Sequence, residues 1–399
     1  MTAVPTPAAS PRPDLKVVAV AGLLLAGGAL ALGGGVDWQK AALYLLGGAL
    51  GLVLYHAAFG FASSWRRLVA ERRGAGLRAQ MLMLALATAI FLPALAEGSL
   101  FGRSVVGAVA PFGVSVAAGA FLFGVGMQLG GGCASGTLYT VGGGSTPMVV
   151  TLVFFAGGSL AGSAQLPWWL GLPKTTVSLP AELGLAGALA LQLALFAAIA
   201  GATALLELRR HGWLEEVRPG ALTLPGKWSA WRRLVQGPWP LFAGAVALAL
   251  LNGATLALAG HPWNVSFGYT LWGAEAAGAL GLDVASWPFW TWPYPKRALE
   301  GGLFAETTSV MNFGIIAGAL LAAGLAGRFA PQRHIAPGTA LAAVIGGLLM
   351  GYGARLAFGC NIGALFSGIA SGSLHGWLWL VAALAGTWVG LKLRPRFGL

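Results

Sequence analysis

Ten long apolar runs constrain this chain more than any other feature, because each is close to the roughly 20 residues that a helix needs to cross a bilayer core. They cover residues 15–35, 41–63, 79–96, 104–128, 147–166, 183–206, 240–260, 307–327, 337–358 and 375–391. We expect residues 41–63 and 266–281 either to span or to re-enter. The sequence therefore predicts an all-α polytopic membrane protein with nine to eleven membrane segments, in one transmembrane domain over residues 1–399.

Composition excludes a soluble enzyme. Of the 399 residues 57% are apolar and 9% are charged, whereas about 25% are charged in an ordinary soluble domain. The 63 glycines favour close helix packing inside lipid. The net charge of +12 indicates basic cytoplasmic loops rather than nucleic-acid binding, because no soluble domain is available to carry that function. The first ten residues are Pro-rich and are expected to form a disordered tail.

Charge also predicts the orientation in the membrane. Basic residues gather in the linkers at residues 65–78 and 209–233, with smaller groups at 328–333 and 392–396. The excess of Lys and Arg in cytoplasmic loops predicts that these segments and the C-terminus face the cytoplasm. The aromatic stretch at residues 287–294 is typical of a membrane interface on the opposite side. We expect a multi-pass protein of the inner membrane.

An internal repeat is the most informative pattern. Residues 124–138 read G-V-G-M-Q-L-G-G-G-C-A-S-G-T-L and residues 351–365 read G-Y-G-A-R-L-A-F-G-C-N-I-G-A-L, with seven of fifteen positions identical at a constant offset of 227. The only two cysteines, Cys133 and Cys360, are therefore equivalent. Linker charges predict inverted repeats over residues 14–166 and 241–394, joined by a helix and basic linker at 167–240. Parallel repeats are the alternative if residues 266–281 span fully.

Each cysteine follows a Gly-rich helix and precedes a segment expected to restart one, at residues 135–141 and 361–370. Lipid tolerates broken helices only where they are buried in protein or line a cavity, and a half-helix N-terminus favours an anion. Alternatively, the glycines are plain helix contacts and the cysteines small apolar residues. The functional interpretation predicts a substrate path formed by Cys133, Cys360, Arg355, Gln128, Ser135, Asn361, Gly132, Gly359, Gly136 and Gly363.

Within this path Arg355 is the one charge inside an apolar helix, at the place where the first repeat has Gln128. An intramembrane charge is by default a functional candidate, so we expect anion binding, with snorkelling or an ion pair as the alternatives. Asn361 and Ser135 would add hydrogen bonds to a bound oxyanion. The other polar groups near the spans are expected to be structural or interfacial, namely Glu275, Glu306, His56 and His375.

The sequence predicts neither a metal nor a cofactor. It has no C-x-x-C pair and no Cys/His cluster of the kind that binds zinc. It also lacks the G-x-x-x-x-G-K-[ST] pattern of nucleotide-binding loops, so we do not expect this chain to use ATP directly.

The pattern G-x-G-x-x-L-x-x-G-C-x-x-G, present at residues 124–136 and 351–363, resembles the YeeE/YedE family of sulfur-transport membrane proteins. H-A-A-F-G-F-A-S-S-W-R-R-L at residues 56–68 is similar to the family's early F-C-F-A-x-x-x-R-D-L segment. The resemblance implies an hourglass-shaped, pseudo-symmetric helical fold that imports thiosulfate past cysteines. It also implies a small cytoplasmic sulfurtransferase-like partner for some members and a link to selenium for others.

Carried over to this chain, the central cysteines of the family are Cys133 and Cys360, but Gly60 stands in place of the early cysteine. A relay of three cysteines therefore cannot operate, and the cargo is open to question.

The leading hypothesis is a transporter, not an enzyme, that moves a small sulfur-containing anion past protonated thiols. An S–H group is a weak donor and a thiolate would repel the ion. A selenium species or another sulfur compound is the nearest alternative cargo. Alternatives of other classes are a membrane thiol/disulfide redox enzyme that uses a Cys133–Cys360 bond and a structural subunit of a larger complex.

Overall fold

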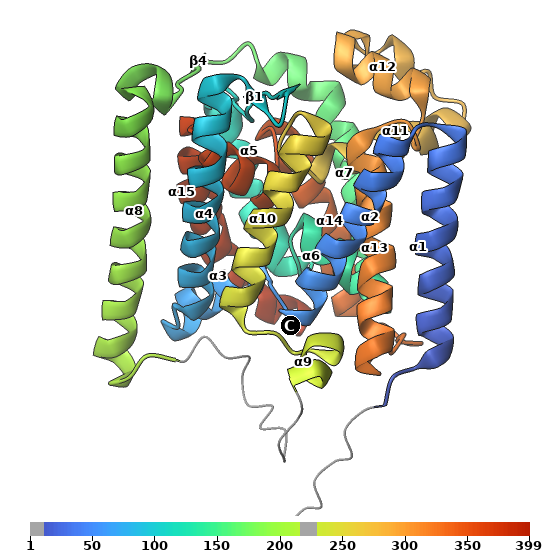
Figure 1. Cartoon of the computed structure of the whole chain (residues 1–399), viewed down its shortest axis with the longest axis horizontal. Coiled ribbons are helices and arrows are strands. Elements are labelled where there is room, and N and C mark those ends of the chain that lie inside the picture. Colours follow the sequence, from blue (N-terminus) through green and yellow to red (C-terminus); the bar gives the residue numbers. More distant parts are fainter. Residues whose placement is uncertain (1–11, 216–229) are drawn as a thin grey trace, which may run out of the picture.

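The computed structural model describes residues 12–215 and 230–399, so the predicted N-terminal tail and residues 216–229 of the basic linker lie outside the described residues. Ten helical stretches within the described residues are long and apolar enough to cross a membrane. Each corresponds to one of the predicted apolar runs. The chain is therefore a helical, multi-pass membrane protein, as predicted (Figure 1).

The first part of the chain contains α1 (Leu15–Gly35), α2 (Trp38–His56), α3 (Phe61–Glu71), α4 (Ala75–Glu97), α5 (Val114–Leu129), α6 (Ala134–Gly142), α7 (Thr146–Trp169) and α8 (Leu179–His211). The second part contains α9 (Ala230–Gln236), α10 (Leu241–Ala259), α11 (Ser266–Ala279), α12 (Pro293–Gly301), α13 (Thr307–Ala326), α14 (Pro337–Leu356), the π-helix η3 (Asn361–Gly368) and α15 (Leu374–Leu393). Short 3₁₀ turns are η1 (Val284–Ser286), η2 (Pro288–Thr291) and η4 (Arg394–Phe397). Strand β1 (Ser99–Leu100) pairs with β2 (Arg103–Ser104), and β3 (Phe112–Gly113) pairs with β4 (Lys174–Thr175).

Two predicted runs have different limits in the structure. The run at residues 104–128 begins too early, because the chain is extended through β2 and β3 and α5 starts only at Val114. The run at residues 41–63 is divided into α2 and α3 by a turn in which Ala58 has a φ of 45°. The window at 266–281 forms α11, whose 14 residues are fewer than the roughly 20 needed to cross the core.

The helices have two common ends, which we name after α9 and α12 because those short helices lie at opposite sides of Figure 1. The C-terminus lies at the α9 end. The larger basic groups, at residues 66–78, 209–210, 232–233, 328–333 and 392–396, belong to elements that reach this end. Basic residues at the α12 end, among those that the structure describes, are Lys40, Arg103, Lys174, Lys296 and Arg297.

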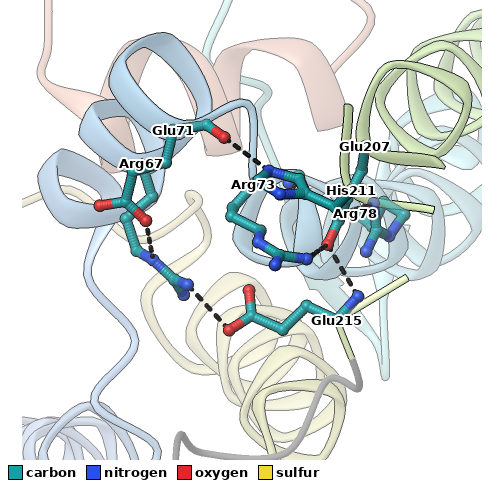
Figure 2. A network of polar contacts seen from close by, with 8 residues as sticks. Arg67, Glu71, Arg73, Arg78, Glu207, His211 and Glu215 are labelled. Carbon is teal, nitrogen blue, oxygen red and sulfur yellow. Dashed lines mark hydrogen bonds and ion pairs between the residues drawn. The ribbon is translucent and has the colours of Figure 1, made fainter. Parts of the chain in front are cut away.

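An ionic network ties the end of α8 to α3 and α4 at the α9 end (Figure 2). The buried carboxylate of Glu207 pairs with Arg73 at 3.1 Å and with Arg78 at 2.8 Å. Close by, Arg67 binds Glu215 at 2.8 Å. A buried carboxylate is stable only when it is paired and hydrogen-bonded, so this network fixes the α9 end of α8 against the basic loop between α3 and α4.

Glycines form the central crossing between α5 and α14. A Cβ atom on Gly126 would lie 2.7 Å from the carbonyl oxygen of Gly346, and one on Gly353 would lie 2.4 Å from that of Gly119. Only glycine allows backbones to approach this closely inside a membrane protein. Because residue 119 meets 353 while 126 meets 346, the two helices run antiparallel. The helices that follow them, α7 and α15, pack against α14 and α5 respectively.

Candidate functional site

The first cysteine lies where α5 ends and α6 begins. Cys133 is buried, and its backbone is extended at the position that caps α6. Its sulfur accepts a hydrogen bond from the Gly136 N–H at 3.4 Å and lies 3.5 Å from the Ser135 hydroxyl. The predicted break and restart of the helix are therefore present, and the thiol faces the open N–H groups of the half-helix.

The second cysteine has the same place at the junction of α14 and η3. Cys360 is fully buried, caps η3 and accepts the Ile362 N–H at 3.4 Å. The turns before the two cysteines also match, because Gly131 and Phe358, which are 227 residues apart, have φ values of 81° and 57°. The left-handed conformation is natural for glycine and strained for phenylalanine, so the second turn is held by its surroundings.

The two half-helices run from the cysteines toward opposite ends of the molecule. At the start of α7, which follows α6, the Thr146 hydroxyl binds the Gln332 carbonyl oxygen near the α9 end. Ser373, which follows η3, forms a bridge with Ser178 beside β4. Because α6 and η3 contact each other, both cysteines lie toward the interior. Both thiols are free, so the bond required by the redox-enzyme alternative is not formed.

Tyr269 joins the two halves of the site, although sequence reasoning missed it. Its buried hydroxyl donates to the carbonyl oxygen of Ala134, the first residue of α6, at 2.9 Å. Its phenol also lies in the neighbourhood of both Cys133 and Cys360. The ring stacks on Phe155 at 4.2 Å between centroids. This side chain of α11 therefore bridges the space between the two half-helices.

Asparagines gather around the second half-helix. The chain has four asparagines in total, and all come from its second half. Asn252 donates to the Ser367 hydroxyl of η3 at 3.3 Å, Asn312 donates to the Val265 carbonyl oxygen at 2.9 Å, and a Cβ atom on Gly363 would lie 2.8 Å from the Asn264 oxygen. Asn361, directly after Cys360, is fully buried with no hydrogen bond on either amide atom. Its amide is thus unengaged beside the thiol.

Arg355 lies in the last turn of α14, and its contacts are aromatic. Its guanidinium carbon is 5.0 Å from the Phe289 ring centroid and 5.9 Å from that of Phe267. No carboxylate among the described residues pairs with it, and its buried Nε has no hydrogen bond. The equivalent Gln128 donates to the Ala62 carbonyl oxygen at 3.1 Å. These contacts direct Arg355 toward η2 and Gln128 toward α3.

The predicted glycines differ in how tightly they are packed. A Cβ atom on Gly359 would lie 2.4 Å from the Ala364 nitrogen, so this position admits no side chain. On Gly136 it would lie 3.3 Å from the Cys133 sulfur, and on Gly132 its nearest neighbour would be 3.4 Å away. Gly132 therefore makes only an ordinary contact.

Gly60, the position of the missing family cysteine, caps α3 beside the first thiol, because the backbone of Phe61 interacts with Cys133. Over the described residues, His, Cys, Asp and Glu side chains form no group of three or more that could hold a metal ion.

The family model described as sulphur transport matches residues 56–389, which includes both cysteine segments. The chain belongs to the sulphur transport family. It is 30% identical over 161 residues to the "Probable transporter YedE" of Escherichia coli K12. This alignment covers 40% of the present chain and 39% of YedE. The chain thus spans about two fifths of the length of that relative.

Longer alignments connect this member of the sulphur transport family to two proteins named "Thiosulfate transporter TsuA". The protein from Spirochaeta thermophila is 30% identical over 283 residues, covering 68% of this chain and 74% of TsuA. The protein from Escherichia coli K12 is 27% identical over 292 residues, covering 70% and 74%. Membership of a transporter family implies that the chain is not an enzyme.

Proposed function

We propose that the protein imports a small sulfur-containing anion, in the first place thiosulfate, across the inner membrane past the neutral thiols of Cys133 and Cys360. The observation that carries this proposal is the pair of matched half-helices, each capped by a buried, free cysteine. N–H groups at the first turn of a half-helix favour an anion at that position. Two such ends that face the interior from opposite sides form successive stations for one ion.

The architecture in this proposal is an inverted repeat, with residues 14–166 and 241–394 as its halves. The element bounds support it, because α1 shifted by 227 residues would cover 242–262 and α10 covers Leu241–Ala259. The antiparallel contact of the equivalent helices α5 and α14 supports opposite orientations. With the basic α9 end in the cytoplasm, the C-terminus is cytoplasmic and the α12 end faces outward.

The chemistry at the stations follows from the side chains around them. A thiolate buried without a cation would repel a dianion and would lack solvation, so each thiol acts as a neutral, polarisable contact for the terminal sulfur. Ser135 and the unengaged amide of Asn361 donate to the oxygens. Arg355, which pairs with no carboxylate among the described residues, attracts the ion on the outer side of Cys360.

Because Gly60 stands where the family pattern has its third cysteine, this chain has no thiol at that position. The polar group of α6 nearest to it is the hydroxyl of Tyr139. A Cβ atom at Gly60 would lie 3.6 Å from the Tyr139 hydroxyl oxygen. We infer that the ion passes a hydroxyl instead of a thiol on its inner side. A selenium species or another sulfur compound is the second candidate cargo, favoured by this departure, and a cytoplasmic sulfurtransferase-like protein is the proposed acceptor.

The test is uptake of ³⁵S-thiosulfate into proteoliposomes that contain the wild type, Cys133→Ala or Cys360→Ala. Both variants are expected to lose uptake, whereas Thr255→Ala should retain it. Thr255 is equally buried, but its hydroxyl bonds only to its own helix, at Leu251. Full uptake by both cysteine variants would refute the path. Absence of uptake in the wild type, with uptake of selenite or another sulfur anion, would assign the alternative cargo.

A further inference from the structure

A separate cavity of about 220 Å³ opens at the α12 end, away from the two thiols. It lies between the first turn of α2, the loop after α10, the helix α12 and the start of α13. Its polar lining consists of Lys40, His261, Tyr294, Arg297, Glu306 and Thr307. These side chains come from four separate elements. They are therefore brought together by the tertiary fold and not by being close in the sequence.

The basic groups of this pocket retain free donors. Lys40 donates to the Thr307 hydroxyl at 2.7 Å, which leaves further N–H groups of its ammonium free. Within the described part of the chain Arg297 has one hydrogen bond, from Nε to the Pro293 carbonyl oxygen at 3.1 Å, so its terminal nitrogens are available there. Lys and Arg donors that converge on one space recognise oxyanions through charge-assisted hydrogen bonds.

The carboxylates near the pocket are engaged in capping helices. Glu306 accepts the N–H groups of Thr308 and Ser309 at 2.9 and 2.6 Å, and also the Tyr294 hydroxyl at 2.8 Å. Asp37, beside the pocket, accepts the backbone N–H of Lys40 at 2.7 Å and so caps α2. Each carboxylate faces the positive end of a helix, which offsets part of its charge. Both carboxylates still act on Lys40, so the guanidinium of Arg297 is the less compensated cation of the pocket.

Tyr294 connects the pocket with Arg355. Its ring lines the cavity and packs 4.9 Å from the ring of Phe267, which in turn lies 5.9 Å from the Arg355 guanidinium carbon. Tyr294 itself lies in the neighbourhood of Arg355. An anion in the pocket would therefore be one aromatic layer away from the unpaired guanidinium.

We propose that this pocket is an outer docking site that binds small dianions by charge and delivers them past Tyr294 to Arg355. Its place on the route rests on the proposed function, whereas its affinity for dianions does not. Neither cysteine lies in the pocket, so it has no means of recognising the terminal sulfur of thiosulfate. It consequently binds sulfate and thiosulfate alike, and discrimination between them is left to the thiols.

The test uses the full-length protein with both cysteines changed to alanine, so that binding is measured without transport. Equilibrium binding of ³⁵S-sulfate and ³⁵S-thiosulfate is compared before and after Arg297→Gln, with Lys40→Gln as the second variant. Each loses a charge-assisted contact, which should weaken binding of both anions about tenfold. Lys296→Gln is the matched control, because Lys296 is on the same helix but lies 3.9 Å from Glu300 and outside this cavity.

Equal weakening by Lys296→Gln would assign the effect to general surface charge and overturn the site. Unchanged binding in Arg297→Gln, or binding of thiosulfate but not sulfate, would also overturn it. In the transport-competent protein, Arg297→Gln should raise the KM of uptake and leave the maximal rate unchanged. Failure of the proposed function has a different signature, since the wild type would then move no thiosulfate while the pocket still bound both dianions.

Discussion

Replacing Asn361 with leucine should stabilise the protein and abolish its function. Asn361 is 0% exposed, and within the described residues neither amide atom of its side chain has a hydrogen-bond partner. Each unsatisfied buried polar atom costs about 1–3 kcal/mol. Leucine removes both penalties, but it is larger than asparagine, and such overpacking costs about 1–3 kcal/mol. With the lower end of each range, the expected net gain in the free energy of unfolding is about 1 kcal/mol.

The matched control is Asn252→Leu, because Asn252 is equally buried but satisfied. Its amide donates to the Ser367 hydroxyl at 3.3 Å and accepts the Trp263 N–H at 2.8 Å. Leucine at this position leaves a buried N–H without an acceptor, which should destabilise the protein by about 2 kcal/mol. The same chemical change is therefore expected to have opposite signs at two positions of one cluster.

Intrinsic fluorescence is a suitable assay, since the chain has 16 tryptophans. Thermal melts in detergent should place Asn361→Leu about 1–2 °C above the wild type and Asn252→Leu below it. At a hundred times its Kd for the site beside Cys360, thiosulfate should stabilise the wild type by about 2.7 kcal/mol through that site. Asn361→Leu should lose this contribution and retain only the stabilisation that comes from the outer pocket. A lower melting temperature for Asn361→Leu, or wild-type uptake by that variant, would refute the assignment of this amide to the ligand.

Three further predictions concern helix packing, the ionic network and the position of the missing family cysteine. Gly353→Ala places a Cβ atom 2.4 Å from the Gly119 carbonyl oxygen and should lower the melting temperature by several degrees, whereas Gly157→Ala, with open space around it, should be neutral or stabilising in the same melts. Glu207→Gln leaves Arg73 and Arg78 without their shared carboxylate, so we expect a loss of about 3–5 kcal/mol, and an unchanged urea or thermal midpoint would contradict the role of the network in Figure 2. Gly60→Cys should fold, because the backbone φ of −99° suits any residue and only the Ser63 hydroxyl, 2.4 Å from the new Cβ atom, must turn. The variant should therefore elute from a sizing column as the wild type does. Mass spectrometry after thiol alkylation in denaturant should then count three cysteines in the eluted protein.

The membrane spans and the two cysteine junctions could be predicted from sequence, because each depends on local information. A helix needs a certain apolar length to cross a bilayer, and the glycines before Cys133 and Cys360 indicate an interruption of the helix. The repeat offset then pairs the two junctions. Errors arose where an apolar run continued into extended chain, as it does ahead of α5, since composition alone does not separate the two.

The remaining parts of the site depend on tertiary packing. Tyr269 approaches the first half-helix from α11, a segment whose contribution the sequence left open. Arg355 is directed by Phe267 and Phe289, which belong to separate elements and carry no motif. One signal was available in the sequence, because all four asparagines come from the second half of the chain. In an apolar background, such a bias indicates a polar cluster.

The glycine crossing of α5 and α14 restricts how this protein can move. Its backbones interlock so closely that sliding or turning one helix on the other would drive Gly119 and Gly126 into their partners. The pair formed by α5 and α14 is therefore rigid, and motion is confined to smaller elements packed against this pair, such as the Tyr269 side chain and the half-helices. Under the proposed function, the ion would pass by movements of side chains and half-helices rather than by rocking of one half of the molecule against the other. The rate of uptake should accordingly rise only gently with temperature, as conduction through a pore does.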